Sequence, residues 1–192
     1  VPTPRKRECM CMSILETTLA AAKKDGATVT PEGKPLRRMI DGVKIRPLPP
    51  HRDARGSVTE LFDPRWDYPA EPLVFVYTFS IKPNVVKGWN LHEIHEDRYA
   101  LLSGTMELVL YDPRPGSPTE GEVCKIVLSP DNRFIVNVPR NVWHADYNIG
   151  TDDAVVVNFP TMQYDHANPD KYRLPIDTDL IPYRFPAGVT GG

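Results

Sequence analysis

The sequence has few of the features that point to an exported, membrane-bound or nucleic-acid-binding protein. Three cysteines in 192 residues are too few for a disulfide framework, so a reducing, cytoplasmic setting is expected. No apolar run approaches the length that spans a bilayer, and no signal-peptide core follows the basic start. The formal net charge of -2 gives no reason to expect nucleic acid or an anionic membrane as a partner.

Helical periodicity is also scarce, and the sequence predicts a single helix. The stretch SILETTLAAAKKDG begins at Ser13, and Glu16 three residues later completes a capping box. Gly26 is placed to end this helix. We therefore divide the chain into a tail, helix and linker over residues 1–37, a main domain over 38–186, and a C-terminal tail over 187–192.

The main domain consists of short apolar runs separated by turns. In the run over residues 105–112, Met106, Leu108 and Leu110 recur at every second position and fall on one face of a strand. The run over 154–159 is apolar on both faces and should be buried. Eight or more strands at roughly ten-residue spacing, with no second helical pattern, predict an all-β sandwich or barrel.

Two polar segments interrupt these apolar runs of the sequence. The first holds Asn90 and His92, which the two-residue period of a strand places on the same face, followed by Asp97. The second, VPRNVWHADYN, holds His144. Polar side chains inside a small barrel are costly unless they bind a ligand or one another. His92, Asp97 and His144 are therefore the candidate catalytic residues, and His95 is expected in the turn or at the rim of the pocket.

These segments resemble the two motifs of the cupin superfamily. The spacing His92-x4-Asp97-x6-Gly104 is similar to the second half of the first motif, with Asp97 for its glutamate and Asn90 for its first histidine. Pro139, His144 and Asn148 match the second motif. The resemblance implies a cupin double-stranded β-helix, which is a jelly-roll barrel, preceded by one helix.

Within the cupins, residues 43–185 resemble the dTDP-4-dehydrorhamnose 3,5-epimerases. The stretches DARGSVTEL, VVKGWNLH, LVLYDPRPGSPTEGE and NVPRNVWHADY carry this resemblance. It implies a homodimer that acts, without a metal, on a nucleotide sugar: a dTDP-linked keto-deoxysugar. The family uses a histidine base, a tyrosine proton donor from a late strand, a lysine that helps to hold the enolate, and an early Arg–Glu pair for the nucleotide.

Transferred position by position, the resemblance gives altered catalytic positions. Arg55 and Glu60 keep the early pair, and Lys87 replaces an arginine while still offering a cation to a diphosphate. The base position falls on Asn90 and the tyrosine position on Asn158. Asparagine can supply neither the base nor the proton. The enolate-binding lysine falls on Asp97 or Arg98.

Three hypotheses follow from these residues. The first is an epimerase or isomerase in which His92 is the base, His144 assists, and Asp97 or Asp177 orients a ring. Its sugar nucleotide would be held by Arg55, Glu60, Lys87, Asn90 and Asn158, without a cofactor. The second is a metal-dependent enzyme for a small oxygenated substrate, with a divalent metal on His92, Asp97 and His144. The third is a sugar-nucleotide-binding cupin that has lost catalysis.

Overall fold

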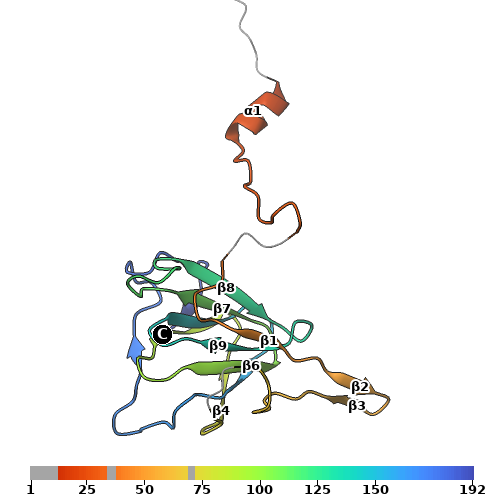
Figure 1. Ribbon diagram of the computed structural model, residues 1–192. Coiled ribbons are helices and arrows are strands. Elements are labelled where there is room, and N and C mark those ends of the chain that lie inside the picture. The colour runs from red at the N-terminus through yellow and green to blue at the C-terminus, as the bar shows by residue number, and fades with distance from the viewer. Residues whose placement is uncertain (1–12, 34–37, 69–71) are drawn as a thin grey trace, which may run out of the picture. The chain divides into compact units, whose positions relative to one another are not determined.

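The computed structural model describes residues 13–33, 38–68 and 72–192 (Figure 1). The chain divides into one unit over residues 1–37 and a second over residues 38–192. Among the described residues, no helix combines the length and apolar character needed to cross a membrane.

The first unit contains helix α1, Ile14–Ala21. The predicted capping box is confirmed: the Glu16 amide donates to Ser13 Oγ at 3.2 Å, and the Ser13 amide donates to Glu16 Oε2 at 2.8 Å. The helix ends five residues before Gly26 because Ala22 already has extended backbone angles. No residue of α1 is buried, so the cap and local helix propensity are what hold it.

The second unit is built almost entirely of antiparallel strands, which confirms the all-β prediction. One sheet has the order β1-β9-β6-β11-β4, and the other has the order β12-β5-β10-β7-β8, with β13 also pairing with β5. Strands β2 and β3 form a separate hairpin at the side of the barrel (Figure 1). The strands are β1 Ile45–Pro47, β2 His51–Asp53, β3 Gly56–Val58, β4 Tyr77–Ile81, β5 Val85–Leu91, β6 Asp97–Ser103, β7 Met106–Tyr111, β8 Val123–Leu128, β9 Phe134–Val138, β10 Trp143–Asn148, β11 Ala154–Asn158, β12 Tyr172–Arg173 and β13 Thr190–Gly191.

The main apolar core fills one end of the space between the two sheets. Met106, Leu108 and Leu110 of β7 are all fully buried in it, as the alternating pattern predicts. They pack with residues of β6, β8, β9 and β11, namely Leu101, Ile126, Leu128, Val136, Val138 and Val156. Strand β11 is buried almost throughout, as its apolar sequence requires. The apolar packing leaves the other end of the same space for the polar residues of β5, β6 and β10.

A second apolar cluster covers the outer face of the β5–β10 sheet. Trp89 of β5 is fully buried there, with its ring against Tyr183 and Phe185 from the C-terminal segment. Near the end of the chain, Thr190–Gly191 pairs in parallel with β5. Strand β5 is therefore held on both edges and on its outer face, which fixes the position of the residues that it directs inward.

Candidate active site

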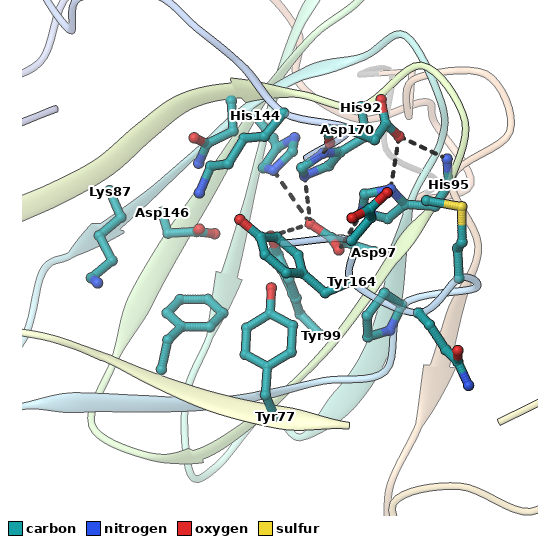
Figure 2. Close-up of a pocket in the computed structure, with 17 residues that line it drawn as sticks. Tyr77, Lys87, His92, His95, Asp97, Tyr99, His144, Asp146, Tyr164 and Asp170 are labelled. Atoms are coloured by element: carbon teal, nitrogen blue, oxygen red, sulfur yellow. Dashed lines mark hydrogen bonds and ion pairs between the residues drawn. The ribbon is translucent and has the colours of Figure 1, made fainter. Parts of the chain in front are cut away.

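A cavity lies at the polar end of the space between the sheets (Figure 2). Side chains of β4, β5, β6 and β10 form its walls, and the loop that follows β11 forms part of its rim. The lining residues are Tyr77, Phe79, Lys87, Asn90, His92, His95, Asp97, Tyr99, His144, Asp146, Pro160, Met162, Gln163, Tyr164, Asp165, Asp170 and Lys171.

The Asp97 carboxylate is the centre of the polar network in this cavity. Only 2% of Asp97 is exposed. Its Oδ2 accepts a hydrogen bond from the Tyr99 hydroxyl at 2.7 Å, and its Oδ1 accepts one from Asn158 Nδ2 at 2.6 Å. A buried carboxylate is tolerated when charged or hydrogen-bonding partners surround it, and here both oxygens have such partners.

His92 follows β5 and forms the closest ion pair with Asp97. Its Nδ1 donates to the main-chain carbonyl of Asp170, which can only accept. Its Nε2 lies 3.1 Å from Asp97 Oδ2 (Figure 2). Burial alone would lower the pKa of His92, but the hydrogen bond and negative charge of Asp97 outweigh burial and raise it. The result is a histidine–carboxylate pair at the cavity wall.

His95 lies in the turn between β5 and β6, as the sequence predicted, and its ring also belongs to the same group. Its ring lies 4.1 Å from that of His92, measured between centroids, and only 9% of the residue is exposed. Its Nδ1 lies 2.8 Å from Asp170 Oδ2 and its Nε2 lies 3.6 Å from Asp97 Oδ1. The reason is the Asp170 carboxylate, which also accepts hydrogen bonds from the main-chain amides of residues 93–95 and so turns this short loop inward.

His144 enters the cavity from β10, in register with Asn90 of β5. Its Nδ1 lies 3.3 Å from the carbonyl of Val142, and its Nε2 lies 3.6 Å from Asp97 Oδ2. Burial, followed by the positive charge of His92, lowers the pKa of His144 to about 3, so its ring is neutral. Among the described residues, His144 Nε2 is a buried nitrogen without a hydrogen-bond partner. This nitrogen is therefore available to a bound ligand.

Comparison with known proteins identifies the family. The model of the family described as dTDP-4-dehydrorhamnose 3,5-epimerase matches residues 37–180. The chain belongs to the dTDP-4-dehydrorhamnose 3,5-epimerase family. Its fold class and its general activity type, both expected from the resemblance, are confirmed.

Two curated proteins and a solved structure illustrate this relationship. The probable low-salt glycan biosynthesis epimerase Agl13 of Haloferax volcanii is 34% identical over 79% of this chain and 98% of its own. The spore coat polysaccharide biosynthesis protein SpsL of Bacillus subtilis is 31% identical over 77% of this chain and 97% of its own. The dTDP sugar isomerase of Desulfovibrio desulfuricans G20 superposes with a TM-score of 0.68 at 27% identity, covering 75% of this chain and 90% of that one.

The structure brings most of the predicted site residues of this epimerase-family chain into one cavity. Lys87 and Asn90 join the three candidate catalytic residues around it, whereas Asn158 lies behind the cavity wall and uses its amide within the protein. Asn158 Nδ2 donates to Tyr77 as well as to Asp97, and its Oδ1 accepts from the Arg98 amide. Asn158 therefore positions Asp97, and its free hydrogen-bonding capacity is small.

Three other predicted residues lie outside the cavity of their own chain. Arg55 is at the tip of the β2–β3 hairpin, where its side chain is 90% exposed and pairs with Asp53. Glu60 is exposed beyond that hairpin. Asp177 is exposed in the C-terminal segment, and Asp170, not Asp177, contacts the histidines. Of the two alternatives for orienting a histidine ring, Asp97 or Asp177, Asp97 is the one that lies next to His92.

Sequence reasoning missed several lining residues, among them Asp146, Tyr77, Asp170 and Lys171. Asp146 stands two residues after His144 on β10, and the two-residue period that paired Asn90 with His92 would have found it. Lys171 and Tyr77 carry no local signal, because only the fold brings the late loop and β4 to the cavity.

Within the described residues, two groups of three side chains have ligand-type atoms within 4.8 Å of one another: His92, Asp97 and His144, and His92, His95 and Asp170. Two imidazoles and one carboxylate suit a divalent transition metal. The metal-dependent alternative thus stays a prediction, to be decided by measuring the metal content.

Proposed function

We propose that this chain catalyses epimerisation of a dTDP-linked keto-deoxysugar at a carbon beside the ketone. The observation that carries the proposal is the His92–Asp97 pair in the cavity of a dTDP-4-dehydrorhamnose 3,5-epimerase-family barrel. Removal of a proton beside a ketone needs a base of suitable pKa and groups that hold the enolate charge. His92 is the base, and the Asp97 carboxylate stabilises the imidazolium that forms.

Two cations at the cavity suit an anionic substrate. Lys87 projects from β5 and Lys171 from the loop before β12, and both line the cavity with the histidines. Burial lowers the pKa of Lys171, which indicates that part of its hydration has been removed. In this proposal the ammonium groups bind the diphosphate or the enolate oxygen, and Asn90 hydrogen-bonds a sugar hydroxyl. His144 assists through its unpartnered nitrogen.

We also propose that the functional unit is a homodimer. Arg55 and Glu60 cannot bind a ligand in the cavity of their own chain, and the β2–β3 hairpin that carries Arg55 stands at the side of the barrel (Figure 1). Exchange of this hairpin would place Arg55 and Glu60 at the cavity of a second copy. Light scattering measures the mass of the protein in solution, which should be that of two chains. Arg55→Ala and His92→Gln chains should recover activity when they are mixed, because one site of each mixed dimer is then intact.

The decisive experiment measures ligand binding and proton exchange separately. Calorimetry with dTDP tests the nucleotide, and incubation of dTDP-linked 4-keto-6-deoxy sugars in deuterium oxide tests the chemistry by mass spectrometry and NMR. Deuterium at a carbon beside the ketone supports epimerisation when His92→Gln loses it from the epimer whose proton faces His92. Binding without exchange would refute catalysis and leave a sugar-nucleotide-binding cupin. Failure to bind dTDP or its sugars would refute the assigned substrate class.

A further inference from the structure

Asp146 is a buried carboxyl group in the cavity to which the proposed mechanism gives no role. It lies on β10 two residues after His144, so both side chains point to the inner face of the sheet. Only 2% of Asp146 is exposed. Figure 2 shows its carboxyl group directed into the cavity from the side of Lys87, whereas His92 and His95 lie on the other side.

The carboxyl group of Asp146 lacks the partners that Asp97 has. Asp146 Oδ1 is fully buried and has no hydrogen-bond partner within the described part of the chain. Buried polar atoms in proteins are nearly always hydrogen-bonded, and leaving one unpaired is costly. A carboxyl oxygen left unpaired at a cavity wall is explained when a bound molecule supplies the missing partner.

The groups that face Asp146 come from several elements. They are Asp97 of β6, His92 after β5, Lys87 of β5, and Lys171 of the late loop. Burial, and next the negative charge of Asp97, raise the pKa of Asp146 to about 8, against the opposing effect of the two lysines and His92. The histidines have the opposite effect on Asp97, whose pKa is held well below its ordinary value although burial opposes this. Both Asp97 oxygens accept hydrogen bonds within the protein, whereas Asp146 Oδ1 has no partner among the described residues, as expected of a supporting anion and of a group that exchanges a proton with a ligand.

We propose that Asp146 is the second proton-transfer residue of the epimerase, acting on the face of the sugar opposite to His92. This role rests on the proposed function. His92, in its neutral form, takes the proton from the carbon beside the ketone, and the electron pair of the broken C–H bond forms the enolate. The Asp146 O–H then gives its proton to the other face of that carbon, and the ketone reforms. The imidazolium and the Asp146 carboxylate return to their starting states by proton exchange with solvent.

The tyrosines of the cavity are the alternative proton donors. The Tyr99 hydroxyl already donates to Asp97, so its proton is committed. The Tyr77 hydroxyl accepts a hydrogen bond from Asn158, and its proton remains free to act. Burial raises the pKa of Tyr77 above its ordinary value, which makes it a weaker acid than Asp146. Tyr77→Phe is therefore the competing variant in the test.

The test follows solvent deuterium exchange from each epimer separately. In Asp146→Asn, the epimer whose proton faces His92 should still exchange, the inverted epimer should not, and interconversion should fall at least about 100-fold. In His92→Gln the pattern should be reversed. A loss of folding or binding would affect both epimers equally, so this crossed pattern separates proton transfer from a structural role. Asp153→Asn makes the same chemical change at an exposed turn and should behave as wild type.

Three outcomes would overturn the inference. These are epimerisation in Asp146→Asn within about tenfold of wild type, equal loss of exchange from both epimers, or the crossed pattern in Tyr77→Phe instead. Absence of any exchange in the wild type is a different result, because it refutes the proposed function itself.

Discussion

Replacing Asp97 with asparagine removes the one anion that the polar network surrounds. Tyr99 and Asn158, which donate hydrogen bonds to Asp97, still contact the amide group of the new asparagine. His92, in contrast, loses its ion-pair partner at 3.1 Å. Truncating one partner of a buried ion pair costs about 3–5 kcal/mol, because the other charge remains buried and uncompensated. For a chain of this size, that corresponds to a decrease in the unfolding temperature of roughly 10 °C.

The pH dependence of this destabilisation identifies its cause. In the wild type, the folded-state pKa of His92 is raised above the ordinary 6.5. Its stabilising contribution is therefore complete below that ordinary value and disappears as the pH rises through the folded-state pKa. Asp97→Asn abolishes this contribution. The difference in unfolding free energy between wild type and variant should thus be larger at pH 6 than at pH 9.

Urea unfolding followed by circular dichroism at both pH values measures this difference. Tyr99→Phe is the matched control, because it removes one hydrogen bond to Asp97 and leaves the charge pair intact. It should cost about 1.5–3 kcal/mol, the usual range for a hydrogen bond to a charged group. A loss below about 1 kcal/mol in Asp97→Asn, or the same loss at pH 6 and pH 9, would refute the electrostatic account of the site.

Three further predictions concern the cavity and its support. Gly88→Ala should lose about 2–4 kcal/mol of unfolding free energy, because φ is +141° and a Cβ would lie 2.7 Å from Ala145 Cα. Gly116 has φ +78° and no atom within reach of an added Cβ, so Gly116→Ala measures the backbone cost alone and should lose only about 1 kcal/mol of unfolding free energy. Asp146→Asn should be more stable than wild type at pH 9 and similar to it at pH 3.5. The reason is that the raised pKa of Asp146, about 8, favours the folded state below the ordinary pKa of 3.8, and this advantage is lost as the pH rises through 8. An equal effect of the substitution at both pH values in urea unfolding would contradict this prediction. Elemental analysis of protein purified without chelators should find well under one divalent ion per chain, whereas a stoichiometric ion that His144→Ala removes would replace the base role of His92 by metal chemistry.

The periodicity of the sequence predicted the parts of the site that depend on single strands. Alternation placed Met106, Leu108 and Leu110 in the core, and it placed Asn90 and His92 on one inward face. These predictions succeed because a strand has only two faces, and burial of one face decides the direction of each side chain.

Long-range contacts explain what the sequence did not predict. His95 is drawn inward by Asp170, which lies 75 residues later, and no local pattern announces that pair. Arg55 and Glu60 carry the residue types of a nucleotide site, yet they are exposed on their own chain. Residue type reports which chemistry is possible, while the distance between a residue and the cavity is decided by the folded topology and by assembly.

Residues that line the cavity differ in how freely they can be replaced, and Asp170 is one that cannot be replaced freely. The loop from Pro160 to Asp165 forms part of the rim, and apart from Thr161, which is hydrogen-bonded to Glu96, its residues can differ without altering a barrel strand. Asp170 cannot vary in the same way, because it fixes the main chain of residues 93–95 and the ring of His95. A loop transplanted from a relative to change substrate range would therefore need to end in the same aspartate. Changes in the loop can alter the substrate range without disturbing the catalytic histidines only if Asp170 is kept.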